Sequence, residues 1–276
     1  MIYKLICNQQ QAWAYQRGIK FDKNGYTFCL DDNLFLPLLP EVKKKFQSGK
    51  GDELGSGGKR GKMQALHSSS ALAVNVFQYW VNRDVSNIAS ACGAPQGITE
   101  MHFERTHTTS LGGIPPHLDI EFSGNGLKPL AIESKFTEPY HRHTKRSIKE
   151  KYLNVPDLWE GLPGCKKLAR HIREEERGKT SFTYLDAPQL LKHILGLTKA
   201  YGAIGFNLLY LWYEVSSPEA KSHRKELKEF EKYIREEVAF REMTYQELFE
   251  TIRKSRGVGE DYISYLAERY FSQLVN

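Results

Sequence analysis

Cysteine is scarce and scattered in this chain of 276 residues. Its four cysteines are Cys7, Cys29, Cys92 and Cys165, and no two of them form a Cys-x-x-Cys pair. A zinc knuckle needs closely spaced thiols and a disulfide framework needs paired ones, so the sequence indicates neither. Scattered thiols are typical of a reducing compartment, and we expect a cytoplasmic protein.

Long apolar runs are also missing. The longest, residues 201–215, is too short to cross a bilayer and contains Asn207. The N-terminus lacks the charged start and apolar core of a secretory signal. The sequence therefore predicts a soluble protein that is not exported and does not contact a membrane.

Positively charged residues are only slightly in excess: the chain has 39 Lys and Arg against 33 Asp and Glu, which gives a formal charge of +6. This excess permits an anionic partner such as nucleic acid but does not require one. Hydrophobic residues make up 40% of the chain and aromatic residues 12%, which excludes global disorder. The length suits one large domain or two modest ones.

The periodicity of apolar residues predicts an α/β protein with a mixed central sheet flanked by helices. Strands are expected where polar and apolar residues alternate or where a short run is apolar on both faces, and helices where apolar residues recur on one face. The expected elements are a buried helix over 63–82, strands at 101–106, 117–122 and 128–136, a helix over 186–201 capped by Asp186, a central strand over 205–215, a charged helix over 218–237, and two helices after Phe240.

The chain divides into three expected parts: an N-terminal extension over 1–47, a core over 48–245, and C-terminal helices over 246–276 packed on the core. The core begins with the glycine-rich basic segment 48–62, for which we expect a mobile loop that serves as a linker or as a lid over the substrate. Residues 141–179 are expected to hold two short helices broken by prolines.

Two carboxylates and a lysine converge on the second and third strands of the expected core. Asp119 lies on one strand, and Glu133 and Lys135 lie on the next. Residues two apart on a strand share a face, so Glu133 and Lys135 project together while Ser134 points into the apolar layer. Partly buried charges cost free energy unless they are paired or hold a metal. Oxygens from Asp119, Glu133 and the backbone carbonyl of Ser134 suit Mg²⁺, with waters completing its shell.

The loop between these strands decides whether the carboxylates meet. A two-residue loop at 125–126 would pair Asp119 with Ile132 and turn Asp119 and Glu133 to opposite faces. A three-residue loop at 125–127 would set Asp119 opposite Glu133. The site therefore requires an odd-length loop or a bulge.

These residues resemble the PD-(D/E)XK nuclease superfamily, which includes most type II restriction endonucleases. The resemblance rests on Pro116-x-x-Asp119, a hairpin, and then Glu133-Ser134-Lys135. The order of a helix, three strands, a helix and a strand also matches the superfamily, and HSSSALAVNVFQYW is similar to its restriction-like members. The resemblance covers roughly residues 50 to 245 and implies a restriction-endonuclease-like αβββαβ core.

The resemblance implies that Asp119 and Glu133 ligate Mg²⁺ and that Lys135 positions or deprotonates the attacking water. A bound cation lowers the pKa of its water and neutralises phosphate charge, and a nearby ammonium stabilises the charge that develops. Many relatives add a glutamate from the preceding helix. That helix has no acid here, so Glu53 in the glycine-rich segment and Glu104 on the first strand are the available substitutes.

Two further features concern the DNA. One branch of the superfamily contacts the DNA backbone through Gln-x-x-x-Tyr on the later helix, and this chain has the similar Gln189-x-x-x-His193. The segment 135–151 contains six lysines or arginines and two acids. It would either meet phosphates or form an ordinary solvated surface.

The resemblance implies a Mg²⁺-dependent endonuclease of the type II restriction kind that hydrolyses phosphodiester bonds in double-stranded DNA. Two alternatives stay open: a repair or processing nuclease of the same superfamily, and a DNA-binding module that keeps the fold but does not cut. A homodimer is expected if the target is palindromic, because two-fold sites match two-fold proteins.

Overall fold

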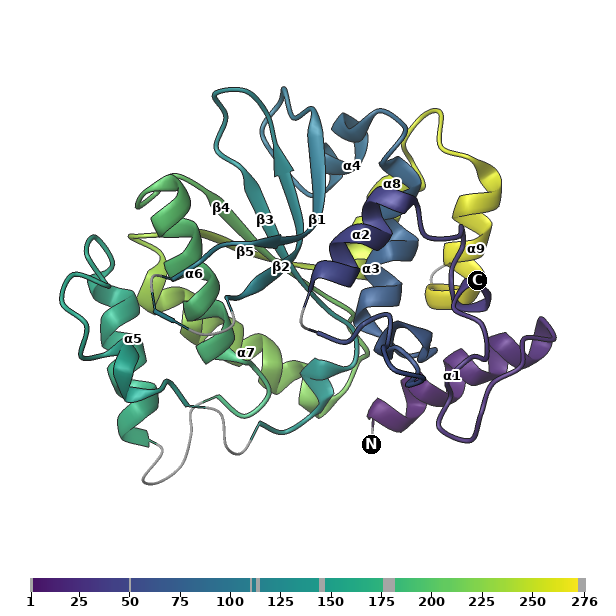
Figure 1. Ribbon diagram of the computed structural model, residues 1–276, viewed down its shortest axis with the longest axis horizontal. Coiled ribbons are helices and arrows are strands. Elements are labelled where there is room, and N and C mark those ends of the chain that lie inside the picture. The colour runs from purple at the N-terminus through teal and green to yellow at the C-terminus, as the bar shows by residue number, and fades with distance from the viewer. Residues whose placement is uncertain are drawn as a thin grey trace.

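The computed structural model describes residues 2–49, 51–109, 111–112, 115–143, 147–175 and 182–272, and it shows a five-stranded sheet between two groups of helices (Figure 1). The strands are β1 (Glu100–Thr106), β2 (His117–Ser123), β3 (Leu130–Lys135), β4 (Asn207–Trp212) and β5 (Ala239–Thr244). They lie in the order β1-β2-β3-β4-β5. The first three are antiparallel and the last three are parallel, so the predicted α/β fold with a mixed sheet is confirmed.

The helices cover both faces of this sheet. In Figure 1, α5, α6 and α7 lie on one side of the strands, and α1, α2, α3, α8 and α9 lie on the other. The helices are α1 (Ile2–Gln16), α2 (Pro40–Ser48), α3 (Ser69–Phe77), α4 (Val85–Ala91), α5 (Pro163–Glu175), α6 (Ala187–Tyr201), α7 (Pro218–Ile234), α8 (Tyr245–Ile252) and α9 (Glu260–Tyr270).

The strands and helices expected in the centre of the chain are confirmed, with small shifts at their ends. Asp186 caps α6 as predicted, since its Oδ1 accepts the N–H of Gln189 at 3.0 Å. All of β4 from Leu208 to Trp212 is buried, as expected for a strand covered on two faces. In α7 the apolar stripe of Leu227, Phe230 and Ile234 is buried.

The single helix predicted over 63–82 is wrong. Only Ser69–Phe77 is α-helical, with a short 3₁₀ turn on either side of it. The backbone before the helix forms other hydrogen bonds, because Ala65 forms a β-bridge with Tyr26. Ser68 then caps α3, since its hydroxyl accepts the N–H of Ala71 at 3.2 Å. An apolar face alone does not reveal such a break.

The C-terminal prediction missed β5, which precedes the two expected helices. This strand pairs in parallel with β4 at the edge of the sheet. Its sequence AFREMT is polar and half-exposed, so composition did not mark it. In residues 141–179, the described part contains one α-helix, α5, which begins at Pro163, rather than two. Residues 144–146 and 176–179 of that segment lie outside the described residues.

The glycine-rich segment forms a loop that folds back on itself; its Lys50 lies outside the described residues. Near its base, Met63 N–H donates to the carbonyl of Glu53 at 2.9 Å. A Cβ at Gly61 would collide with that same carbonyl, so glycine is required there. The fold thereby holds Glu53 at a defined position beside the start of α3.

Candidate active site

The register of β2 against β3 is the one that a three-residue loop predicts. Ile120 pairs with Ile132 and Phe122 pairs with Leu130. One step further along the same register, Asp119 lies level with Glu133. The two carboxylates therefore share one face of the sheet, and the register prediction is confirmed.

A third carboxylate comes from β1. Phe103 pairs with Ile120 and Arg105 pairs with Leu118, so Glu104 lies level with Asp119. The φ angle of Glu104 is 51°, in the left-handed region that residues other than glycine rarely adopt. Backbone strain of this kind collects at functional sites. Three adjacent strands thus bring an acid each to one level of the sheet, and we call Glu104, Asp119 and Glu133 the acidic row.

Burial and mutual repulsion raise the pKa of two members of the row. The pKa of Asp119 is raised well above its ordinary value, first by burial and then by Glu133. Burial, followed by Glu53 and Glu133, raises the pKa of Glu104 to about 8. Asp119 is fixed because its Oδ2 accepts the backbone N–H of Ser134 at 2.7 Å. A cation placed here would relieve the repulsion.

Glu133 carries its negative charge between two nitrogen-bearing side chains. Lys135 Nζ lies 2.5 Å from Glu133 Oε1, and His193 Nε2 lies 3.0 Å from Glu133 Oε2. Burial acts to raise the pKa of Glu133, but Lys135 and then His193 outweigh it and hold the pKa at about 2. Burial acts to lower the pKa of Lys135, but Glu133 and Glu138 raise it to about 12. Lys135 is therefore an ammonium.

Helix α6 presents both residues of the Gln-x-x-x-His pair to this face. Residues four apart lie on one side of a helix. Gln189 Oε1 accepts from Lys135 Nζ at 3.1 Å, and His193 is 1% exposed against Glu133. In the structure the pair therefore contacts the Glu133 and Lys135 side chains directly.

Glu53 lies beside the row rather than in it. Its Oε2 accepts from the hydroxyl of Ser70, at the start of α3, at 2.7 Å. Burial raises its pKa, and its charge acts on Glu104. The structure thus brings both predicted substitutes for the missing helix acid to one place, with Glu104 nearer to Asp119.

The opposite face of β3 is structural. Ser134 points into the apolar layer, as predicted, and its Oγ lies 2.6 Å from the hydroxyl of Tyr245 on α8. This bond fixes β3 between α8 on one side and α6 on the other. The chemistry is thereby confined to the face that carries Glu133 and Lys135.

The oxygen donors suit a hard cation. Within the part of the chain that the structure describes, no three His, Cys, Asp or Glu side chains are arranged to hold one metal ion. Mg²⁺ does not require three, because it binds through one or two carboxylates and keeps several waters. Asp119 and Glu133, with the Ser134 carbonyl, therefore fit such an ion.

A neighbouring network escaped the sequence prediction. Glu121, two residues after Asp119, is fully buried and bound by the side chains of Arg105 at 2.9 Å, His107 at 2.6 Å and Tyr201 at 2.7 Å. The one sequence signal for this network is the alternation of β2, which places Glu121 on the same face of the sheet as Asp119. These three contacts tie the Glu121 carboxylate to β1 and α6 as well as to its own strand, so it has a structural role beside the acidic row.

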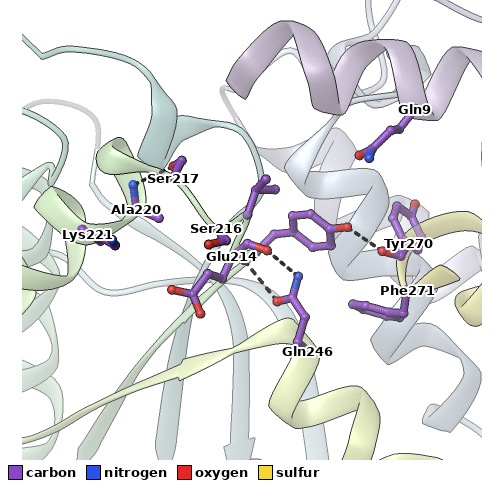
Figure 2. A pocket seen from close by; sticks show the side chains of 11 residues that line it. Gln9, Glu214, Ser216, Ser217, Ala220, Lys221, Gln246, Tyr270 and Phe271 are labelled. Atoms are coloured by element: carbon purple, nitrogen blue, oxygen red, sulfur yellow. Dashed lines mark hydrogen bonds between the residues drawn. The ribbon is translucent and has the colours of Figure 1, made fainter. Parts of the chain in front are cut away.

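A separate pocket of about 390 Å³ lies beyond the end of β4 (Figure 2). Gln246 spans its floor, accepting from the N–H of Glu214 at 3.1 Å and donating to its carbonyl at 2.7 Å. The Glu214 carboxylate is bound to Arg224 at 2.8 Å. None of the acidic row lines this pocket, so we assign it no part in the chemistry.

The basic segment 135–151 is described only in part, because residues 144–146 lie outside the described residues. Lys151 Nζ donates to the carbonyl of Gly112 at 2.7 Å. The ring of His141 packs against Tyr3 with centroids 4.4 Å apart. Phosphate contact by this segment stays a prediction.

The chain belongs to the family described as Restriction Endonuclease associating with ARP, whose model matches residues 8–271. No curated protein and no solved structure matches the chain. Among the described residues, no helix is both long and apolar enough to span a bilayer. The family identifies a restriction-endonuclease-like protein, and its match includes α9 and most of α1 as well as the sheet.

Proposed function

We propose that this member of the restriction-endonuclease family is a Mg²⁺-dependent DNA endonuclease of the PD-(D/E)XK type, acting on double-stranded DNA. The observation that carries the proposal is the acidic row with Lys135 on the same sheet face. The order from α3 through β4 supports a restriction-endonuclease-like core. Hydrolysis of a phosphodiester needs charge neutralisation beside a positioned water, and this face supplies the groups.

In this proposal Asp119, Glu133 and the Ser134 carbonyl hold Mg²⁺. When bound, the ion neutralises the scissile phosphate and makes a ligated water more acidic. The Ser134 N–H keeps Asp119 aimed at the row. Glu104 is the accessory acid, because the register places it level with Asp119 while Glu53 lies outside the row.

In the proposed reaction Lys135 acts as a positively charged hydrogen-bond donor. Its ammonium is held by Glu133 and Gln189, both of which accept from it. An ammonium in this position stabilises negative charge on the phosphate and orients the attacking water. Gln189 and His193 then position Lys135 and Glu133. For a palindromic target we propose a homodimer, since the symmetry of the site would match that of the protein.

Plasmid cleavage tests the proposal. The wild type should nick or cut plasmid in Mg²⁺ and not in EDTA, and Asp119→Ala and Lys135→Ala should reduce activity by at least about 100-fold because the stabilisation of developing charge is removed. The exposed Asp32→Ala variant, purified in parallel, should keep full activity. Equal cutting by wild type and Asp119→Ala would refute the nuclease assignment.

Sequencing the ends of the cut DNA separates the nuclease classes. Discrete ends would indicate site-specific restriction, and random ends would indicate a processing nuclease. Binding without cleavage by the wild type in Mg²⁺ would indicate a DNA-binding module.

A further inference from the structure

An exposed surface of aromatic rings and cations adjoins the end of α1. Tyr15 is 80% exposed and Phe28 is 60% exposed, the most exposed aromatic side chains among the large hydrophobic ones described. Between them lies a shallow groove of about 480 Å³ lined by Tyr15, Gly18, Ile19, Lys20, Phe21 and Phe28. We call Tyr15, Lys20, Lys23, Phe28, Lys59 and Arg60 the aromatic–basic surface. Exposed aromatics grouped in this way mark an interaction site.

The aromatic–basic surface is held by a built turn. Asp22 Oδ1 accepts the backbone N–H groups of Asn24 at 2.8 Å and Tyr26 at 3.0 Å. Phe21 and Thr27 form a bridge across the turn, and Tyr26 forms another with Ala65. Phe28 therefore directly follows a hairpin with a defined conformation, and this hairpin is bonded to the segment just before α3.

The glycine-rich loop joins this surface to the acidic row. Near the tip of the loop, Arg60 Nη1 lies 2.6 Å from Asp22 Oδ2, and its guanidinium lies 4.6 Å from the centre of the Phe28 ring. At the base of the same loop, a Cβ built on Gly49 would lie 3.6 Å from Glu104 Oε2, so the loop begins beside the acidic row. The loop therefore extends from the acidic row to the aromatic–basic surface.

Three of the four cations of the surface are available to an anionic ligand. Lys20, Lys23 and Lys59 are exposed, and none has an ion-pair partner in the described part of the chain. Lys20 lines the groove with both rings, Lys23 lies in the turn that leads to Phe28, and Lys59 precedes Arg60 in the chain. Exposed cations that accompany exposed rings favour a polyanion that also carries flat or apolar groups. Duplex DNA has both, as phosphates along its strands and as base and sugar edges in its grooves.

We infer that the aromatic–basic surface binds the duplex on one flank of the cleavage point, with its lysines on phosphates and Phe28 in a groove. This inference rests on the proposed nuclease function, and it adds a binding surface formed by residues 15–28 and the tip of the loop. Arg60 keeps the Phe28 ring oriented, because the guanidinium covers one face of the ring and leaves its other side to the ligand.

Equilibrium binding tests the inference without cleavage. Full-length protein is titrated into a fluorescein-labelled random duplex in EDTA over a series of salt concentrations. The double variant Lys20→Gln/Lys59→Gln should flatten the slope of log K against log salt by about 0.9 for each phosphate that the protein no longer neutralises. Phe28→Ala should weaken binding about tenfold with little change in that slope.

A matched control removes the same charge elsewhere. Lys128→Gln/Lys254→Gln alters the β2–β3 turn, at the end of the strands away from Glu133, and the segment after α8. This variant should keep the wild-type salt slope. Melting temperatures of all variants should match the wild type, because Lys20, Lys59 and Phe28 are exposed.

The outcomes separate this inference from the proposed function. If the surface variants bind like the wild type, the inference is overturned even if the enzyme cuts DNA. If the wild type binds no duplex at low salt, the inference also fails. Loss of binding in the surface variants alone, with Asp119→Ala still binding, supports it.

Discussion

At the scale of single residues, the most informative position is Glu104. Its backbone lies in the left-handed region at the level where β1 passes Asp119. A glutamate in an ordinary strand would gain nothing from that conformation, whose cost is on the order of 1–3 kcal/mol. In the proposed function, this conformation would hold Glu104 beside two other acids, where it could support a bound cation.

Replacing the two accessory acids should distinguish their roles. Glu104→Gln should lower Mg²⁺-dependent cleavage about 10- to 100-fold, because it removes the carboxylate that supports the proposed metal site. Glu53→Gln should have a smaller effect, since its carbonyl oxygen can still accept from Ser70. The Mg²⁺ dependence of plasmid cleavage measures both variants. A larger loss in Glu53→Gln would reverse the assignment.

The buried His223 predicts how stability depends on pH. Its ring packs against Tyr210 and Trp212. Burial, followed by repulsion from His143, lowers its pKa to about 3 from the ordinary 6.5. The unfolded chain therefore takes up this proton first as pH falls. The neutral His223 ring therefore does not reduce the free energy of unfolding above pH 6.5. Below pH 6.5 this free energy decreases by about 1.4 kcal/mol per pH unit, until His223 is protonated in the folded protein near pH 3.

Urea unfolding at several pH values checks this expectation. His223→Phe keeps an aromatic ring but has no proton to bind, so the loss of stability between pH 6.5 and 4 should be shallower than in the wild type. Parallel pH curves for wild type and His223→Phe would contradict the argument.

At the scale of elements, the sequence predicted those parts that depend on local pattern. Alternation located β2 and β3, and the structure has the register of the three-residue loop, which the site required to bring Asp119 level with Glu133. The edge strand β5 was missed because Arg241 and Glu242 give it no apolar signature. The network around Glu121 was also missed, since Tyr201 comes from a helix far along the chain. Contacts that form only in three dimensions leave no local signal.

Helix α6 carries Gln189 and His193, and its first turn is stabilised by the Asp186 cap. Asp186→Ala removes the side-chain acceptor of the Gln189 N–H and should cost about 1 kcal/mol of unfolding free energy. Asp186→Asn retains an acceptor and should be much less destabilising. Urea unfolding of the two variants tests this. Equal losses would show that charge rather than capping is responsible.

At the scale of the whole molecule, Arg269 joins the two ends of the chain. It is 3% exposed and bonds to the side chains of Gln10 at 3.1 Å and Tyr265 at 2.6 Å and to the carbonyl of Asn33 at 2.8 Å. Its guanidinium also lies 4.4 Å from the Trp13 ring. The N-terminal helix α1 is thereby held against α9 through buried polar contacts, and residues beyond the proposed nuclease core contribute to one structure.

Arg269→Met should therefore destabilise the protein strongly. The substitution leaves several buried acceptors unpaired, and we expect a loss of about 3 kcal/mol in the free energy of unfolding. Arg256→Met, at an exposed position before α9, should change it by less than about 0.5 kcal/mol. Chemical denaturation measures both. Similar values for the two variants would show that the buried contacts contribute little.

The odd-length turn between β2 and β3 also has a genetic consequence. Deleting one residue from 124–129 would shift β3 by one position, and because side chains alternate, Glu133 and Lys135 would turn toward α3 and α8 while Ser134 would turn toward α6. Asp119 would then lack its neighbour without any acidic residue being mutated. Deletion of a single codon in this turn would thus inactivate the proposed enzyme although every residue of its site is still encoded.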